Sequence, residues 1–555
     1  MLTGAAGRPA CSGHTDLSWK DTMTTTNSPD GPNALPGDHQ LTDQEHKRLS
    51  AGAVGLVGVL FMAVANAAPI TAMTFNVPIA IGYGNGIGAP GGFLFATIVL
   101  TIFAVGYAAM SKYITTTGAF YGFISQGLGQ IPGMVSGLLA TFCYVIFEAS
   151  LLGGFAYFAK LYFLDPAGIS VSWAAIAILG AIVIGVFGYF KITITAGILS
   201  VTLVAEVLLL LALGISVLVK GGPDGFMVAE TLSPVAAFTD LPEGAFGTGA
   251  AAGVAAIGVF FAFWSWVGFE TTAVYGEESK DPKRVVPRAT IIAVVGLGVF
   301  YTFISWMVVV GNGAAGSVET AAGASPADLF LNLTTANLGA PLTVIYKLLV
   351  VIGSFACAMA FQNAAPRYLY ALGRESASPF LRRTIGTVHP KHGSPANAGI
   401  LQAVITVLIL LYFAQFVTMT DGDGNPTPDL VPYVYVYGLL AVVGTAVILI
   451  LQTMTSAAVI SFFWVKKVHK GNVITTLICP IIGGLGMVYV LVLLWQNRAF
   501  ALGAAAESWI WTWAPFYILV MIVIGIVYSL WVKKSHPEIY DEIGRTTLEE
   551  AHERV

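Results

Sequence analysis

Twelve separate stretches of the sequence are apolar over a length that can cross a membrane. The hydrocarbon layer of a bilayer is about 30 Å thick and an α-helix rises about 1.5 Å per residue, so about 20 apolar residues span it. Charged residues make up only 10% of the chain, against roughly 25% in an ordinary soluble domain. The sequence therefore predicts an all-α membrane protein with about 12 transmembrane helices. The predicted spans lie near 53–80, 92–110, 132–161, 173–190, 194–219, 250–276, 289–311, 340–370, 397–417, 433–464, 473–495 and 511–532.

Lys and Arg are concentrated in every second connection between these spans. Since cytoplasmic loops of membrane proteins keep positive charge, this bias predicts that both termini are cytoplasmic in a bacterial plasma membrane. Only Lys160, Lys220 and Arg498 fall on the outer side. The connections predicted to be cytoplasmic carry Lys112, Lys191, Lys280, Lys283, Arg284, Arg288, Arg374, Arg382, Arg383, Lys391, Lys466, Lys467, Lys470, Lys533 and Lys534.

The chain ends and the longer outer connections are polar. Residues 1–50 have no apolar core and no small-residue cleavage site, so we expect a disordered cytoplasmic tail rather than a signal peptide. The outer connections at 220–249 and 312–339 are acidic or neutral. An acidic vestibule would steer cationic substrates, but the simple exclusion of Lys and Arg from exported loops explains the composition as well.

Several function classes lack their signatures in this chain. It contains no phosphate-binding GxxxxGK[ST] loop, which argues against an ATP-driven pump. All eight histidines fall in tails or loops, and three of the four cysteines lie inside apolar spans. We therefore expect neither a metal site nor a cofactor, and no enzymatic activity.

The first span contains a predicted helix break. In ANAAPITAMTFNVP, residues 65–78, Pro69 lies inside an apolar run, lacks an N–H group and clashes with the carbonyl of Ala65. Thr71 and Thr74 follow and can partner freed backbone groups. A transporter uses such a break to turn backbone groups toward a substrate at mid-membrane, whereas a structural helix would show only a proline kink.

A second predicted break lies in the sixth span, within FFAFWSWVGFETTAVYGEE, residues 260–278. If the fold consists of two five-helix repeats, the odd number of helices turns the second repeat upside down and places the two breaks across a pseudo-two-fold axis. We accordingly predict repeats at 51–219 and 250–464. The remaining predicted parts are an extracellular connection at 220–249, two peripheral helices at 465–534 and a cytoplasmic C-terminal tail at 535–555.

The sequence WSWVGFETTAVYGEESKDPKRVVPRAT, residues 264–290, resembles the sixth-helix signature of the amino acid, polyamine and organocation (APC) superfamily of permeases. GAFYGFISQGLG, residues 118–129, and AAPRYLYALGRE, residues 364–375, are similar to further segments of that family. The resemblance implies a leucine-transporter-type 5+5 inverted repeat with two peripheral helices, and secondary active transport by alternating access. The chain departs from the family at the first break, where relatives carry glycines and this sequence has Ala68 and Pro69.

The resemblance also implies where a substrate binds. An amino-acid carboxylate is expected on backbone N–H groups of the half-helix that follows the first break, and the ammonium on carbonyls of the unwound sixth span. Trp264 matches the position of an aromatic lid over the substrate, although core packing is the alternative. The candidate substrate-binding residues are Ala68, Ile70, Thr71, Ala72, Phe263, Trp264 and Ser265.

Four charged residues lie well inside apolar spans, and they are the candidates for proton coupling or gating: Glu148, Glu206, Glu270 and Lys347. A charge at a helix centre costs about 2.5–3.5 kcal/mol on insertion scales, so such residues are seldom idle. Glu206 is either a proton carrier or a neutral acid that bonds a neighbouring helix. Glu270 is suited to bond the unwound backbone or to titrate. Glu148 and Lys347 either form a pair, or Lys347 reaches toward the membrane surface.

These observations predict a secondary transporter that imports amino acids, with the proton as coupling ion. Proton coupling is favoured over sodium because the eighth span offers Ser354 without a Ser/Thr pair. An amino-acid exchanger and a permease for putrescine, ethanolamine or another small amine remain alternatives. A non-transporting receptor or channel is a remote alternative, because channels rarely need two broken helices across a pseudo-two-fold axis and the sequence shows no large sensory domain.

Overall fold

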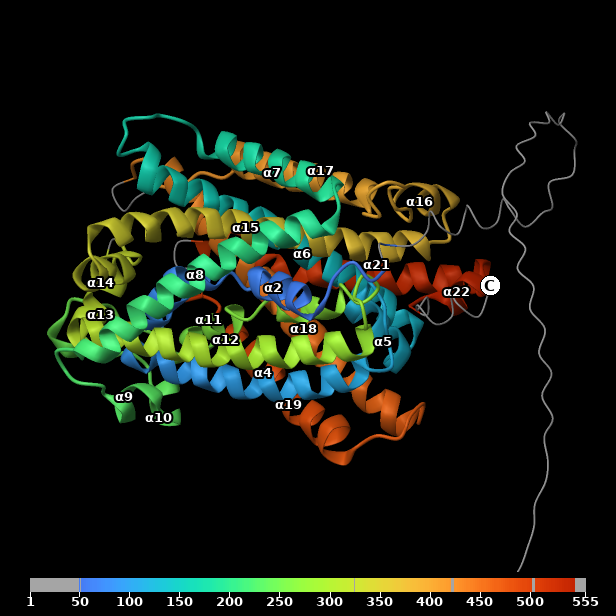
Figure 1. The fold of residues 1–555 in the computed structure, drawn as a ribbon, viewed down its shortest axis with the longest axis horizontal. Helices are drawn as coiled ribbons and strands as arrows, with labels where there is room; N and C mark the ends of the chain where they lie inside the picture. Colours follow the sequence, from blue (N-terminus) through green and yellow to red (C-terminus); the bar gives the residue numbers. More distant parts are fainter. Residues whose placement is uncertain (1–48, 50, 324, 421–423, 502–504, 545–555) are drawn as a thin grey trace, which may run out of the picture. The chain divides into compact units, whose positions relative to one another are not determined.

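The computed structural model describes residues 49, 51–323, 325–420, 424–501 and 505–544, and this part of the chain is built from helices, turns and two isolated β-bridges. The predicted N-terminal tail lies outside the described residues apart from Leu49. Figure 1 shows long helices packed side by side along one direction.

The α-helices are α2 (Leu56–Asn66), α3 (Pro69–Ala80), α4 (Ala89–Ser111), α5 (Ala119–Leu128), α6 (Gln130–Ala159), α7 (Trp173–Tyr189), α8 (Ile192–Lys220), α9 (Val228–Leu232), α10 (Pro234–Ala237), α11 (Ala255–Trp264), α12 (Pro282–Asn312), α13 (Ala314–Ala321), α14 (Asp328–Leu338), α15 (Ala340–Arg374), α16 (Pro379–Thr384), α17 (Ala396–Phe416), α18 (Leu440–Ile460), α19 (Cys479–Gln496), α20 (Trp509–Thr512), α21 (Ala514–Ser535) and α22 (Pro537–Glu542). Short π-helical segments at Ile81–Asn85, Lys160–Leu164, Pro432–Leu439, Ser461–Val465 and Ile474–Ile478 adjoin several of them, and 3-10 turns lie at Gly86–Gly88, Ala245–Gly247, Phe269–Ala273 and Pro428–Leu430.

The predicted spans correspond to these helices. By length and apolar composition, nine helical stretches of the described chain can cross a membrane. One of them, Leu56–Ser111, contains the first two predicted spans. The shorter apolar helix α7 is the fourth, and the sixth is interrupted after Trp264. The all-helical membrane fold is therefore confirmed, and the sixth span consists of the half-helix α11 followed by irregular turns, as its predicted break requires.

Helices five positions apart in the predicted order of spans pack against each other. α3 contacts α11, α4 contacts α12, α6 contacts α15, and α7 contacts α17, and Figure 1 shows the last pair along one edge of the bundle. A two-fold axis between two repeats produces this pattern, because each helix near the axis meets its own counterpart. The other contacts follow the same symmetry, since α8 packs on α15 as α18 packs on α6. The packing matches a 5+5 inverted repeat, and the residue boundaries of the repeats stay predictions.

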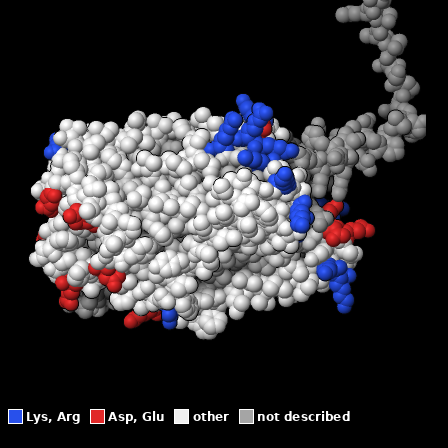
Figure 2. All heavy atoms as spheres, turned by 90° about the horizontal axis from the view of Figure 1, so that it is seen from below, with Lys and Arg blue, Asp and Glu red and all other residues white. Residues whose placement is uncertain are grey.

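Basic loops and acidic loops lie at opposite ends of the bundle. Figure 2 shows Lys and Arg mainly at one end of the visible face and Asp and Glu mainly at the other. One end, called the basic end below, carries the loops at 112–118, 277–284 and 374–394. The opposite end, called the acidic end, carries the connections at 221–254 and 313–339. The short helices α9, α10, α13 and α14 lie in the loops of the acidic end.

The two predicted breaks are both present and touch each other. α2 ends at Asn66 and α3 begins at Pro69, while α11 ends at Trp264 and gives way to turns. Gly268, in those turns, has a φ of +121°, and a Cβ added to it would lie 2.4 Å from Asn66 Cβ and 3.0 Å from Ala67 N. Only glycine fits this position, because its missing side chain lets one broken backbone lie against the other.

Gly268→Ala is predicted to lower the free energy of unfolding by at least about 2 kcal/mol, because the new Cβ clashes with Asn66 and the positive φ strains alanine. Thermal unfolding of the purified protein in detergent measures the loss. Gly296→Ala is the matched control, since its Cβ meets no atom within 4 Å inside α12. The control should gain about 0.5–1 kcal/mol from helix propensity. Equal stability of the two variants would contradict the contact between the breaks.

Candidate functional site

Neighbouring helices bind the backbone groups that the first break frees. Ala68 adopts a left-handed conformation, with φ 45° and ψ 67°, directly before Pro69. The carbonyl of Asn66 accepts a hydrogen bond from Cys357 Sγ at 3.1 Å, and the carbonyl of Ala67 accepts one from Tyr301 Oη at 3.1 Å. The break predicted from Pro69 is confirmed, and side chains of α12 and α15 bond the carbonyls that it frees.

Glu206 of α8 reaches the same break. Its Oε2 accepts a hydrogen bond from the backbone N–H of Ile70 at 3.3 Å, and the residue is buried. A Cβ added to Gly353 of α15 would lie 2.7 Å from Glu206 Oε1 and 2.9 Å from Ile70 Cγ2. The carboxyl is therefore enclosed between α8, α3 and α15. Two roles were predicted for Glu206, a proton carrier or an acid that bonds a neighbouring helix. The structure contains the hydrogen bond that the second role requires.

Thr71 joins this cluster through its hydroxyl, which lies 3.3 Å from Ser354 Oγ. Both side chains are buried. The N–H groups expected to bind a substrate carboxylate begin at Ile70, and there the protein's own carboxylate occupies the first of them. Any carboxylate that binds this N–H group has to displace Glu206 or share the group with it.

Glu270 folds back onto the unwound stretch after α11. Its carboxylate accepts hydrogen bonds from Gly268 N at 3.0 and 3.2 Å and from Tyr144 Oη at 2.9 Å. Tyr107 Oη donates to the Glu270 carbonyl at 2.8 Å. Thr271 Oγ1 accepts from Asn66 Nδ2 at 3.0 Å, which ties the two breaks together. Glu270 was predicted either to bond the unwound backbone or to titrate, and the structure contains the bond to the backbone.

A small cavity of about 20 Å³ lies where the breaks meet. One water needs about 10–15 Å³ on this measure, so the cavity holds a water molecule but no amino acid until its walls move. Of the predicted substrate residues, Ala68, Ala72 and Trp264 line it, whereas Ile70, Thr71, Phe263 and Ser265 lie behind the lining. The lining residues are Asn66, Ala67, Ala68, Ala72, Asn76, Phe147, Leu151, Trp264, Val267, Cys357, Phe361 and Tyr437.

Two asparagines in this lining were missed by the sequence analysis. Asn66 and Asn76 are buried, and the side-chain oxygen of each has no hydrogen-bond partner among the described residues. Their amide nitrogens are engaged, since Asn66 Nδ2 donates to Thr271 Oγ1 and Asn76 Nδ2 donates to Ser265 Oγ at 2.8 Å. Buried oxygens without donors cost free energy, so a bound donor is favoured there. The sequence feature that could have indicated them is the presence of an asparagine on each side of Pro69 within an apolar span.

Aromatic rings close the cavity toward the acidic end. The ring of Phe75 lies 5.1 Å from that of Trp264, 5.1 Å from that of Tyr433 and 4.4 Å from that of Tyr437. Tyr157 continues the layer with a ring 4.6 Å from Tyr433. Trp264 therefore both lines the cavity and packs in this layer, so the lid and the packing interpretations apply to the same ring.

Ion pairs close the protein toward the basic end. Arg367 of α15 donates to both oxygens of Glu278, at 2.6 and 2.9 Å, and both side chains are buried. Arg374 donates to Glu277 at 3.1 and 3.2 Å. Arg367 was not counted among the charges within the spans, although it lies inside the predicted span 340–370. Glu277 and Glu278 thus connect the turns after α11 to α15.

Glu148 and Lys347 do not meet. Glu148 Oε2 accepts hydrogen bonds from Gln402 Nε2 and, at 3.1 Å, from Thr406 Oγ1, both on α17. Lys347 Nζ lies 5.5 Å from the centre of the Tyr162 ring. The alternative of a Glu148–Lys347 pair is therefore wrong, because the two side chains point to different helices.

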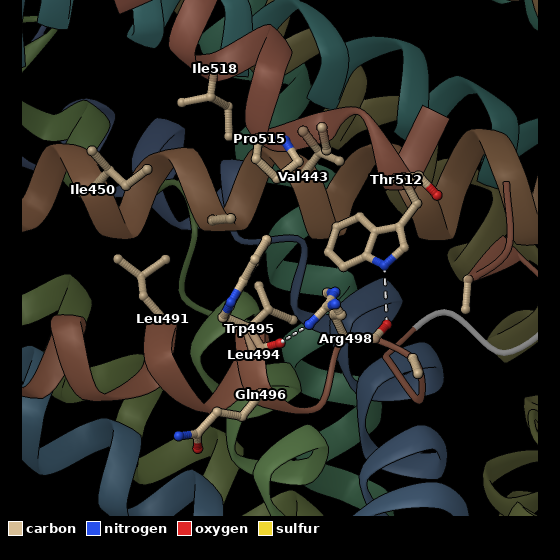
Figure 3. Close-up of a pocket in the computed structure, with 15 residues that line it drawn as sticks. Val443, Ile450, Leu491, Leu494, Trp495, Gln496, Arg498, Thr512, Pro515 and Ile518 are labelled. Atoms are coloured by element: carbon tan, nitrogen blue, oxygen red, sulfur yellow. Dashed lines mark hydrogen bonds between the residues drawn. The ribbon is translucent and has the colours of Figure 1, made fainter. Parts of the chain in front are cut away.

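The larger pockets lie away from the breaks. One of about 620 Å³ lies between α18, α19 and α21 and is lined mainly by aliphatic and aromatic side chains, together with Arg498 beside Trp495 (Figure 3). It has no residue in common with the cavity at the breaks. Within the described part of the chain, no group of three His, Cys, Asp or Glu side chains is arranged to hold a metal ion.

The sequence matches known permeases over most of its length. A model of the family described as amino acid permease matches residues 54–534. The low-affinity putrescine importer PlaP of Escherichia coli is 23% identical over 77% of this chain and 85% of its own. The branched-chain amino acid permease BcaP of Lactococcus lactis is 25% identical over 64% of this chain and 74% of its own. These matches confirm the predicted resemblance and a transporter rather than an enzyme. The chain belongs to the amino acid permease family.

Proposed function

We propose that the protein imports amino acids across the plasma membrane together with protons, by alternating access and with both termini in the cytoplasm. The observation that carries this proposal is the hydrogen bond from Ile70 N–H to the carboxyl of Glu206. It connects the group expected to bind a substrate carboxylate with a buried group that can carry a proton.

Charge repulsion provides the coupling. A substrate carboxylate that binds at Ile70 brings a second negative charge against Glu206, in a buried place where like charges strongly repel. Protonation of Glu206 removes that repulsion and weakens its hold on the N–H group. Binding of a proton therefore raises the affinity for the substrate, and binding of the substrate raises the affinity for the proton. Symport requires this coupling.

Closure on both sides of the cavity supports alternating access. The aromatic layer around Phe75 covers the acidic end, and the pairs Arg367–Glu278 and Arg374–Glu277 cover the basic end. A carrier must open one cover while the other stays shut. The excess of Lys and Arg in the loops of the basic end supports a cytoplasmic position for that end.

The cavity lining favours an amino acid with an apolar side chain. Phe147, Leu151 and Phe361 supply an apolar wall. Asn66 and Asn76 supply two free oxygens that suit an ammonium group. No carboxylate is among the residues that line the cavity. A diamine carries two positive charges and no carboxylate, so it is less well matched. A putrescine-type amine remains the second candidate, because one relative is a putrescine importer.

Ligand-induced stabilisation separates these substrate classes. Apolar amino acids are expected to raise the midpoint of thermal unfolding of the purified protein, and diamines are not. A ligand at 100 times its Kd adds about 2.7 kcal/mol of stability. Ala72→Phe fills the cavity and should abolish the shift. Stabilisation by diamines alone, with loss on Glu148→Gln rather than on Ala72→Phe, would overturn the amino-acid proposal.

Glu206→Gln is predicted to uncouple transport. In proteoliposomes, one proton per substrate gives about tenfold accumulation for each unit of pH gradient. The variant should show no accumulation but should still exchange internal for external amino acid, because glutamine still accepts the Ile70 N–H bond without a charge.

Glu148→Gln is the matched control for this experiment, since Glu148 is also a buried carboxyl but bonds α17 instead of a break. The control should accumulate substrate like the unmodified protein. If a sodium gradient drives uptake and a pH gradient does not, proton coupling is wrong while the transporter assignment stands.

Asn76→Leu is predicted to raise the KM for amino acids about tenfold or more, because a hydrogen bond to a charged group contributes about 1.5–3 kcal/mol. Initial uptake rates in proteoliposomes measure it. Asn312→Leu removes an amide that bonds only the carbonyls of Val308 and Leu329 near the far end of α12, and it should leave KM unchanged. An equal effect of both substitutions would exclude a role of Asn76 in binding the ammonium.

A further inference from the structure

A second pocket, of about 730 Å³, lies at the basic end and shares no residue with the cavity at the breaks. It is formed by α4, by α12 and by Thr475 ahead of α19. Four of its eleven lining residues are Lys or Arg, and most of the others are aliphatic. The lining residues are Val105, Ala108, Ala109, Lys112, Lys283, Arg284, Pro287, Arg288, Ile291, Ile292 and Thr475. This set is called the basic pocket below.

The basic pocket has the same order of chemistry along both helices. On α12, Arg284 and Arg288 are four residues apart and so share a face, and Ile291 and Ile292 follow them toward the middle of the bundle. Along α4, Lys112 follows the last turn and Val105 lies two turns earlier on the same side. Positive charge thus lies at the end of the bundle, and the aliphatic wall lies deeper.

The cations of α12 are at the unfavourable end of their helix. The N-terminus of a helix carries a partial positive charge, which repels Lys and Arg in the first turn. The first turn of α12 contains no acidic residue. Within the described part of the chain, the one ion pair of Arg284 is with Asp281, at 3.6 Å and with both side chains more than half exposed, and such a pair contributes little. A bound anion would relieve this accumulation of positive charge.

Lys112 and Arg288 add to the excess. Both are exposed, and neither has an ion pair, hydrogen bond or ring contact within the described part of the chain. Isolated surface cations are ordinary in a cytoplasmic loop. Here they border a pocket with an aliphatic wall. Such a pocket suits an amphipathic ligand with an anionic headgroup and an apolar chain.

We propose that the basic pocket binds one anionic phospholipid, with its phosphate between Lys112, Arg284 and Arg288 and an acyl chain along Ile291, Ile292 and Val105. Basic pockets between transmembrane helices recognise lipid headgroups in this way. Each methylene group of an acyl chain that is buried from water strengthens binding, and a free phosphate has no such group. The pocket volume lies within the range of about 300–1,000 Å³ typical of small-molecule sites.

Lipid binding to the full-length protein in neutral detergent tests this proposal. Phosphatidylglycerol and phosphatidylcholine with identical chains are titrated, and bound lipid is counted by native mass spectrometry. The unmodified protein should prefer phosphatidylglycerol. Arg284→Gln with Arg288→Gln should weaken phosphatidylglycerol binding about 30-fold, since each cation near a membrane surface contributes about 1 kcal/mol toward an anionic lipid. Phosphatidylcholine binding should weaken much less, because the choline cation balances the charge of its phosphate.

The matched control removes two charges at the same end, with Lys533→Gln and Lys534→Gln on α21, and should retain the preference. Ala109→Trp fills the pocket without changing charge and should weaken the binding of both lipids, which keeps the test valid if the arginine variant does not fold. Equal loss in the control and the arginine variant would overturn the proposal. Equal affinity for the two lipids, or equal thermal stabilisation by inorganic phosphate and phosphatidylglycerol, would also overturn it.

Discussion

The close approach of Gly268 to Asn66 and Ala67 is the contact on which the rest of the interior depends. A helix broken at mid-membrane leaves N–H and C=O groups without partners, and each unsatisfied group costs several kcal/mol in hydrocarbon. Placing the two breaks against each other confines these groups to one region. Glu206, Tyr301 and Cys357, from α8, α12 and α15, then bond backbone groups of the first break. Tyr107 of α4 bonds the Glu270 carbonyl in the second.

The buried carboxyls fall into two groups according to their partners. Glu277 and Glu278 at the basic end bond arginines, and such a pair must separate if the end opens. Glu206, Glu270 and Glu148 bond N–H, hydroxyl and amide groups, and no ion pair is recorded for them within the described residues. A carboxyl without a cation can gain a proton without stranding an opposite charge. That difference separates residues suited to gating from residues able to gain a proton. Of the latter, Glu206 is the one that bonds Ile70 N–H at the first break, whereas Glu148 bonds α17.

Hydropathy and local chemistry were sufficient to predict the helices and both breaks. Pro69 has no N–H group, and Ser265, Gly268 and Glu270 interrupt an apolar run. Each break could therefore be predicted from the residues that form it. The partners of the buried polar groups were not predictable, because they depend on the rotation of each helix about its axis. Glu148 faces α17 and not Lys347 for this reason. Asn66 and Asn76 escaped notice because a neutral amide carries no charge penalty, although it forms hydrogen bonds as specifically as a carboxyl.

The two covers of the cavity differ in what their opening costs. Separating Arg367 from Glu278 exposes both groups to water, whose solvation replaces most of the lost attraction. Separating Phe75 from Tyr433 and Tyr437 exposes apolar rings, which costs about 0.5–1.5 kcal/mol for each ring pair in addition to the lost burial. An empty carrier is therefore expected to open more readily at the basic end. A substrate that packs its own apolar side chain under Trp264 compensates for part of the lost aromatic contact, and this makes opening of the acidic end dependent on substrate.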